Sequence, residues 1–190
     1  MIIGNPCRFA IESSITEAYS RKSLMALGYF AFHISGQCYG VREDDATLLA
    51  CSYDSIKSRC NNIGKHCADA LMSMSGLDVA DDYYSVFYRE HTRPLRGGLS
   101  VIEWESLVAQ RPSGIAMAPD GDSAFDDGSY VLQMDFQDMA RVIAFKVGDN
   151  SSIDKECVAE VRLPMKEFYD ILQSWCNEFY AEWERRVKLE

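Results

Sequence analysis

Four carboxylates and two Asp-Gly pairs are crowded into one short segment, residues 118–130 of the chain. The segment lies between two apolar stretches, and its acidic residues are Asp120, Asp122, Asp126 and Asp127. Carboxylates at this density are solvated, bind a metal ion or face a basic partner. These four side chains are therefore the first candidates for a functional site.

Calcium is the metal that such a segment could bind, because carboxylate oxygens are its preferred ligands. A calcium-binding structural or signalling module built on loop 120–128 is therefore one hypothesis. An EF-hand is not indicated, since the fifth, sixth and twelfth residues counted from Asp120 are Ala124, Phe125 and Val131. In another interpretation the Asp-Gly pairs are turns that join a strand near residues 115–117 to one at Tyr130, with the acids in water.

The whole chain shares this acidic bias. It has 29 Asp and Glu residues against 19 Lys and Arg, a formal net charge of -10 and a pI near 4.8. Nucleic acids and anionic membranes require basic surfaces, so we expect neither as the main ligand. A basic protein partner fits better, and its candidate contacts are Asp120, Asp122, Asp126 and Asp127.

Patterns typical of catalysis are absent from the sequence. There is no G-x-S-x-G elbow to present a serine nucleophile, and Gly97-Gly98 lacks the other residues of a phosphate-binding loop. A hydrolase that uses two of the clustered carboxylates remains a third hypothesis, because sequence spacing cannot place them across a substrate cleft. We expect a protein that is not an enzyme.

Cysteine usage and hydropathy bear on the compartment. The seven cysteines lack C-x-x-C spacing and fit a reducing environment, and no zinc-site spacing is present. No run of 18 apolar residues occurs, and the N-terminus lacks the pattern of an export signal. We expect a cytoplasmic protein without a metal or cofactor.

The elements that must position the acidic segment follow from periodicity. Strand-like runs include a hairpin over residues 28–41 and a meander over residues 130–163. Helical patterns cover residues 78–90 and 101–110, and another begins near Ser52, with Asp54 as N-cap and Gly64 as the stop. Pro164 opens a long amphipathic helix with an aromatic stripe.

These patterns predict an α+β fold: an antiparallel meander sheet with helices packed mainly on one face and a long C-terminal helix. The 190 residues suffice for a single domain over 1–190, with a possible helical lobe at about 53–98. Three tryptophans are expected in the core rather than at a binding surface: Trp104, Trp175 and Trp183. We interpret His33 as a hydrogen-bonded strand histidine, since no nucleophile or acid stands at a diagnostic spacing from it.

The acidic segment also resembles a known family. Residues 118–122, 124–129 and 131–133 are similar to motifs of immunity protein family 42 of bacterial polymorphic toxin systems. Further matching residues lie in the N-terminal half and at Ile143-Ala144-Phe145-Lys146, and the likeness is weakest over about 61–100. The resemblance therefore covers most of the chain.

The resemblance implies an antitoxin that stays in the producing cell, binds a cognate toxin domain and occludes or distorts its active site without catalysis. The acidic composition is complementary to a toxin that is a nuclease with a basic cleft. Within such families the surface that contacts the toxin generally varies. The motif residues could therefore maintain the fold rather than touch the toxin.

Overall fold

The computed structural model describes residues 1–89, 95–110, 112–118, 122–148 and 152–188. The strands are β1 (Ile2–Asn5), β2 (Phe9–Ala18), β3 (Ala26–Ile34), β4 (Gln37–Tyr39), β5 (Thr47–Leu48), β6 (Ala116–Ala118), β7 (Ser129–Phe136), β8 (Met139–Gly148) and β9 (Ser152–Pro164). The helices are α1 (Leu49–Cys60), α2 (Gly76–Tyr88), α3 (Val101–Ala109) and α4 (Met165–Val187), with short 3₁₀ turns η1 (Asp69–Leu71) and η2 (Ser123–Phe125).

Sheet A is antiparallel and has the strand order β1-β2-β3-β4, with β5 also paired to β3. The hairpin predicted over residues 28–41 is confirmed as β3 and β4. Its two turn residues, Ser35 and Gly36, both have a positive φ, at 51° and 84°. Two-residue hairpin turns need this conformation because it matches the twist of the strands.

Sheet B follows the chain order β6-β7-β8-β9 and is antiparallel throughout. The predicted meander over residues 130–163 is confirmed, as is the strand expected near residues 115–117. Apolar side chains occupy both faces of sheet B, and adjacent residues Val142 and Ile143 of β8 are both fully buried. Since neighbouring strand residues point to opposite faces, sheet B must be covered on both sides.

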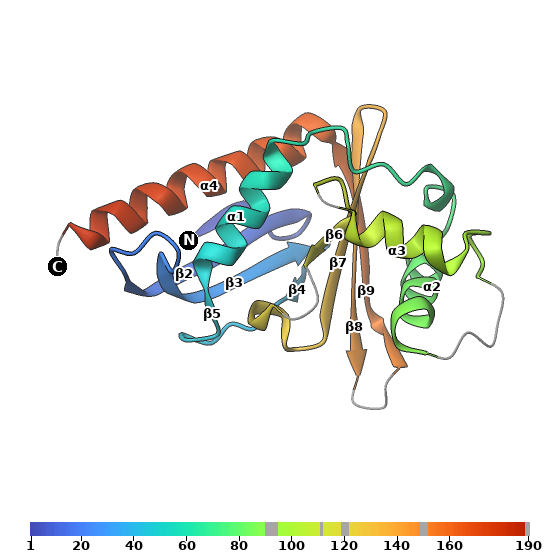
Figure 1. Cartoon of the computed structure of the whole chain (residues 1–190), viewed down its shortest axis with the longest axis horizontal. Helices are drawn as coiled ribbons and strands as arrows, with labels where there is room; N and C mark the ends of the chain where they lie inside the picture. The colour runs from blue at the N-terminus through green and yellow to red at the C-terminus, as the bar shows by residue number, and fades with distance from the viewer. Residues whose placement is uncertain (90–94, 111, 119–121, 149–151, 189–190) are drawn as a thin grey trace.

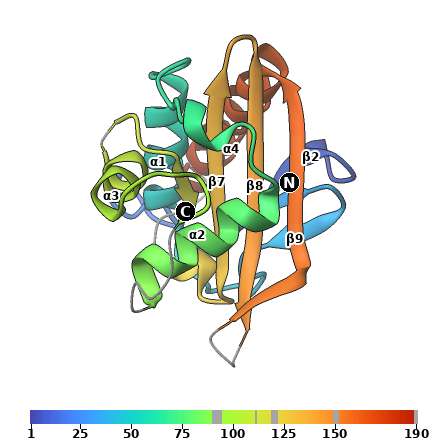
Figure 2. The same ribbon diagram turned by 90° about the vertical axis from the view of Figure 1, so that its right-hand side faces the viewer.

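Two cores fill the space on either side of sheet B. One is shared with sheet A, α1 and α4, and the other with α2 and α3 (Figure 1). Figure 2 shows α2 crossing in front of the strands of sheet B, with α3 to their left. The predicted α+β class with antiparallel strands and a long C-terminal helix is confirmed, and the structure adds a second sheet. Because one core joins both sheets, we propose that the chain is a single domain.

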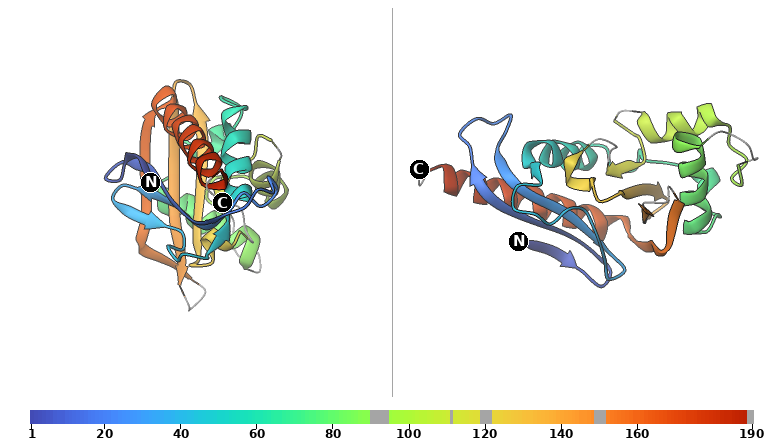
Figure 3. Two further views of the ribbon diagram at one scale, coloured as in Figure 1. Left: turned by 90° about the vertical axis from the view of Figure 1, so that its left-hand side faces the viewer. Right: turned by 90° about the horizontal axis from the view of Figure 1, so that it is seen from below.

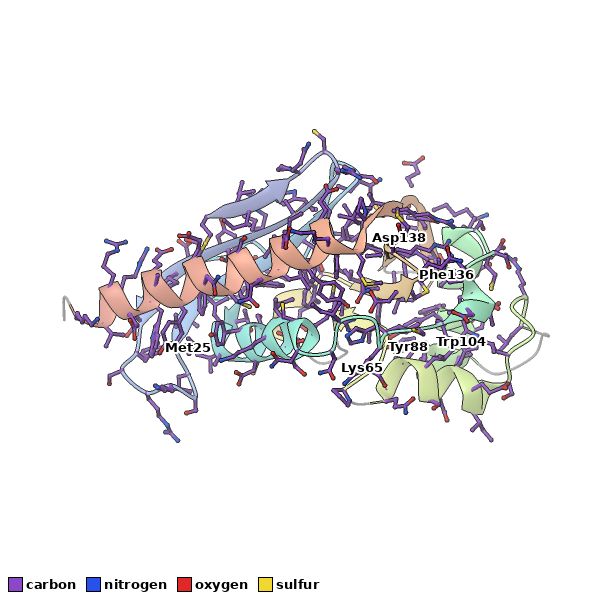
Figure 4. The ribbon with its side chains drawn as sticks, turned by 90° about the horizontal axis from the view of Figure 1, so that it is seen from above. Met25, Lys65, Tyr88, Trp104, Phe136 and Asp138 are labelled. Carbon is purple, nitrogen blue, oxygen red and sulfur yellow. The ribbon has the colours of Figure 1, made fainter. Side chains whose placement is uncertain are left out.

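Helix α4 begins directly after Pro164, as predicted, and packs its aromatic stripe against sheet A. Trp175 Nε1 donates to Ser13 Oγ at 2.9 Å, and Trp183 Nε1 donates to the Tyr19 carbonyl at 3.0 Å. Both indoles are buried, as is Trp104, which lies on α3 in Figure 4. All three tryptophans are therefore core residues, as expected. No helix in the described ranges is both long and apolar enough to cross a membrane.

The start of α1 differs from the sequence prediction. The helix begins at Leu49, and its N-cap is Leu48, which makes no side-chain capping hydrogen bond. Asp54 is inside the helix, so its predicted N-cap role is wrong, and the helix ends at Cys60, before Gly64. Burial of the first turn against the core outweighs capping preference here, because Leu49 is fully buried.

Helix α2, unlike α1, begins with a side-chain N-cap. Ser75 accepts from the backbone N–H of Asp78 at 3.1 Å, so the helix starts two residues before the predicted Asp78. Its predicted end at Glu90 lies outside the described residues. Helix α3 matches the prediction within one residue and begins with a capping box formed by Ser100 and Glu103.

Strand β9 is an edge of sheet B, and the β3–β4 hairpin covers part of that edge. Ser35 Oγ donates to the carbonyl of Glu160 at 2.8 Å. Gln37 Nε2 donates to the carbonyl of Glu156 at 3.0 Å, and the Tyr39 hydroxyl donates to that of Cys157 at 3.0 Å. Side chains of sheet A thus occupy backbone acceptors of sheet B.

Asp135 of β7 is a buried acidic residue that is only 1% exposed. The Tyr169 hydroxyl of α4 donates to it at 2.9 Å, and Gln133 Nε2 donates at 2.7 Å. It also accepts from the backbone N–H groups of Gly64 at 2.9 Å and His66 at 3.3 Å. One carboxylate therefore joins β7, α4 and the segment after α1.

Arg59 of α1 extends this buried network. It donates to Gln133 Oε1 at 2.5 Å and to the carbonyls of Gly114 at 3.1 Å and Ala116 at 2.7 Å. Burial lowers the pKa of its guanidinium to about 10, so it stays charged at neutral pH. The network thereby links α1 to sheet B.

Arg141 of β8 points to the opposite face of sheet B, towards the segment before α2. Its side chain is 1% exposed and donates to the carbonyls of Leu71 and Met74, each at 2.7 Å. It also contacts both oxygens of Glu160, at 2.9 and 2.8 Å. The segment that leads into α2 is thus attached to sheet B by a buried charge.

We predict that Asp135→Asn lowers the free energy of unfolding by about 2 to 4 kcal/mol, because an amide nitrogen replaces an acceptor among several donors. Chemical denaturation of the two proteins measures the difference. Asp138→Asn is the control, since Asp138 is exposed in the turn after β7. An equal, small effect of both substitutions would contradict a stabilising role for the buried carboxylate.

Candidate functional site

Residues 122–128, the described part of the acidic segment that precedes β7, are held by contacts with other parts of the fold. Asp122 is the N-cap of η2, and its Oδ1 accepts from the Ala124 N–H at 3.0 Å. The same oxygen accepts from Thr47 Oγ1 of β5 at 3.3 Å. Phe125 is buried and stacks on Phe32 of β3, with ring centroids 5.8 Å apart. Side chains of sheet A therefore hold the segment in place.

Asp127 is also held by neighbouring groups. Its Oδ2 accepts from Lys146 Nζ at 2.5 Å and from the Gly40 N–H at 3.4 Å, and its Oδ1 accepts from the Ser129 N–H at 3.2 Å. Burial alone would raise the pKa of Asp127, but the hydrogen bonds from Lys146 and Ser129 outweigh it and lower the pKa. The carboxylate is ionised and helps to place the loop.

The remaining candidates differ in exposure. Asp126 is exposed to solvent beside Asp127, and Asp120 lies outside the described residues. Gly128 has a φ of 76°, so the second Asp-Gly pair is the turn that the sequence predicted. Of the described candidates, Asp126 is the one most accessible to a partner.

A second acidic segment lies against the first. Backbone N–H of Val41 donates to the Ala124 carbonyl at 2.8 Å, which places the loop between β4 and β5 beside η2. That loop carries three exposed acids: Glu43, Asp44 and Asp45. Thr16 Oγ1 donates to the Asp44 carbonyl at 2.5 Å, so the end of β2 and its exposed Glu17 lie nearby.

We define the acidic surface as the described carboxylates of these segments: Glu17, Glu43, Asp44, Asp45, Asp122, Asp126 and Asp127. Sequence reasoning found the later segment and missed the earlier one. Residues 43–45 carry a local acidic run, but only the fold shows that the run adjoins residues 122–127. Like charges gathered on one face create a potential that attracts a cationic partner and repels an anionic one.

Comparison with known families gives this surface a context. A family profile described as Immunity protein 42 matches residues 1–178. The chain belongs to the Immunity protein 42 family. The resemblance seen in the sequence is thereby confirmed, and the protein is a non-enzymatic immunity protein of bacterial toxin systems.

A solved structure supports the fold of this Immunity protein 42 member. The chain is similar to the one described as "Crystal structure of CdiI from Burkholderia dolosa AUO158", with a TM-score of 0.58 and 16% sequence identity. The match covers 94% of this chain and 99% of that one. Among curated proteins, none matches. At this identity the structural likeness establishes a shared fold.

The calcium hypothesis gains no support from the geometry of the Immunity protein 42 chain. Within the described ranges, no three His, Cys, Asp or Glu side chains are grouped where they could hold a metal ion. Asp122 and Asp127 direct oxygens at N–H and O–H donors, whereas calcium needs six to eight oxygen ligands. The described carboxylates act as loop anchors and as surface charge.

Two grooves of this immunity protein lie along α4, away from the acidic surface. One, of about 400 Å³, lies between Ile3 of β1 and the start of α4. The other, of about 550 Å³, lies between α1 and α4 and is lined by Tyr53, Tyr180 and Trp183 among others. Neither groove is lined by a residue of the acidic surface.

We predict that Asp127→Asn lowers the free energy of unfolding at pH 7 by about 1 to 2 kcal/mol, through loss of the charge-assisted bond to Lys146. Because the pKa is lowered in the folded state, the contribution is complete above the ordinary value of 3.8 and is lost as pH falls below it. The deficit of the variant should therefore shrink in acid. Urea denaturation at several pH values measures this.

Asp126→Asn is the matched control, since it makes the same change one residue earlier at an exposed position. We expect it to alter stability by less than about 0.5 kcal/mol. A deficit of Asp127→Asn that stays constant down to pH 3 would show that ionisation of Asp127 does not hold the loop.

Proposed function

We propose that this immunity protein binds its cognate toxin domain through the acidic surface and covers the toxin's active site. We further propose that the toxin is a nuclease with a basic cleft and that the complex forms in the cytoplasm of the producing cell. The observation that carries the proposal is the pair of contacts from Val41 to Ala124 and from Thr47 to Asp122, which bring the loop with residues 43–45 beside residues 122–127 in an acidic protein.

The chemistry of a nuclease supports this choice of partner. Nucleases bind a polyanionic backbone, and Lys and Arg side chains supply most of that binding. An acidic surface presented by ordered loops can occupy the same cationic groups. The loops of this chain are held by Phe125, Asp122 and Asp127, so little conformational entropy is lost when a partner binds them.

Occlusion also accounts for inhibition without chemistry. A protein bound over the cleft excludes the substrate and needs no reactive group of its own. Charge complementarity further speeds encounter, from about 10⁵–10⁶ M⁻¹s⁻¹ for neutral surfaces towards roughly 10⁸–10⁹ M⁻¹s⁻¹ at low salt. Fast capture suits a protein that must neutralise a toxin before the toxin acts.

The direct test is calorimetric titration of the full-length protein with its cognate toxin domain, together with an assay of toxin activity in the same samples. We expect one-to-one binding and loss of activity at equivalence. Absence of binding would overturn the proposed function. Binding that leaves the toxin active on nucleic acid would overturn occlusion as the mechanism.

We predict that the triple variant Asp44→Asn, Asp45→Asn, Asp126→Asn slows association with the toxin domain about tenfold at low salt. Its association rate should also depend less on salt, because fewer charges act across the approaching surfaces. Stopped-flow measurements between 20 and 500 mM salt, roughly a fivefold range of Debye length, would show both effects.

The control is a second triple variant, Asp54→Asn, Glu105→Gln, Glu178→Gln. It removes the same number of charges at exposed positions on α1, α3 and α4. We expect its association rate to stay within about twofold of the wild-type rate, since steering depends on where the charge lies. Equal slowing of both variants would mean that net charge alone matters, and the acidic surface would lose its special role.

A further inference from the structure

A buried carboxylate lies on the face of sheet A that is turned away from α1 and α4. Glu12 of β2 accepts from the Tyr29 hydroxyl at 2.9 Å and from Arg42 Nη2 at 2.8 Å, and its other oxygen lies 2.7 Å from His33 Nε2. Its side chain is only 6% exposed. His33 is therefore a hydrogen-bonded strand histidine, as the sequence predicted.

This burial is unusual for its position. Along β2, Phe9 and Ile11 point into the core, so Glu12 points to the opposite face. Figure 4 shows α1 and α4 over sheet A from above, and Figure 3 (right) shows the strands from the opposite side. Tyr29 and His33 of β3 are partly exposed on that side. The side chains that bond Glu12 are thus what covers it.

The arrangement keeps Glu12 charged. Burial would raise its pKa, but the hydrogen bonds from His33, Tyr29 and Arg42 outweigh that effect, and the pKa is lowered. A buried anion with several donors is a rigid junction, because each donor must keep its position to compensate the charge. Glu12 therefore restrains three side chains at the surface.

Arg42 is the most accessible of these side chains. It is 54% exposed, and its guanidinium carbon lies 6.0 Å from the centre of the Tyr29 ring. A guanidinium has five N–H donors, so the bond from Nη2 to Glu12 leaves donors for a partner. Arginine and tyrosine held in fixed positions are the residue types that most often dominate binding energy in protein interfaces.

The cluster is continuous with the acidic surface. Arg42 directly precedes Glu43, and Gly40, two residues earlier, donates to Asp127. A restrained cation therefore stands at the border of the acidic surface, whereas Lys146 is already paired with Asp127. Many basic proteins can approach the acidic part, whereas a cation at a set position discriminates among them.

We propose that Arg42, held by Glu12 and Tyr29, determines partner specificity by binding a carboxylate of the toxin domain. The inference rests on the proposed function and adds a partner chemistry: a largely basic surface that carries one acidic side chain opposite Arg42. An arginine binds a carboxylate through two parallel hydrogen bonds, which sets register as well as affinity. A toxin with a cation at that position would be repelled.

Dissociation rates test this proposal. The full-length protein and its variants are flowed over an immobilised, catalytically inactive cognate toxin domain, and association and dissociation are measured separately. We expect Arg42→Gln to dissociate at least tenfold faster and to associate at nearly the wild-type rate. Arg42→Lys keeps the charge beside Glu12 but lacks the planar fork, so it should also dissociate faster.

Arg8→Gln is the matched control. Arg8 is 44% exposed and paired with Glu167 of α4 at 2.6 Å, so it belongs to the opposite side of sheet A. The variant removes the same charge and should dissociate at the wild-type rate. Thermal melts of all variants establish that each is folded before its rates are compared.

The outcomes separate the two proposals. Wild-type dissociation rates for both Arg42 variants, with association still slowed by loss of the acidic surface, would overturn the role of Arg42 and leave the proposed function standing. Equal acceleration by Arg8→Gln and Arg42→Gln would also overturn it. A wild-type protein that does not bind the toxin domain would overturn the proposed function itself.

Discussion

Both faces of strands β7 and β8 are buried over most of their length, so the charged and amide side chains there need partners inside the protein. This constraint organises the structure. On one side, Asp135 and Gln133 accept hydrogen bonds from α1, from α4 and from the segment directly after α1. Gln133 also donates to Asp135. On the other side Arg141 binds carbonyls that lead into α2. The apolar cores supply most of the stabilisation, whereas these polar contacts determine which helix meets which strand and in what orientation.

The ordered acidic loops depend on the same layered arrangement. Phe125 reaches the core that sheets A and B share, and Asp127 is bonded to Lys146 of β8 and Gly40 after β4. The loop can therefore present Asp126 only when both sheets are in place. A surface built from two distant chain segments is assembled by the fold as a whole, so under the proposed function the stability of this immunity protein and its recognition of the toxin depend on the same contacts.

Local patterns in the sequence predicted much of this fold. The hairpin at Ser35-Gly36, the meander of β7 to β9 and helix α4 have strong periodicity or turn chemistry, and each was found. Strands β1 and β2 were not predicted, because β2 places Glu12, Ser13 and Ser14 where an exposed segment would be expected. Their burial depends on Tyr29, Trp175 and other residues far along the chain. Composition identifies the acidic loop at residues 120–128. It does not show that residues 43–45 lie beside this loop, because a local sequence pattern carries no information on contacts between distant segments.

The hairpin of β3 and β4 also bears on how the protein behaves at high concentration. An uncovered edge strand offers rows of backbone groups on which another chain can form a sheet, and β9 is long enough to act in this way. Ser35, Gln37 and Tyr39 occupy carbonyls along that edge. Self-assembly through β9 would require these bonds to break first. The hairpin therefore reduces the number of free backbone acceptors that β9 offers to a second chain.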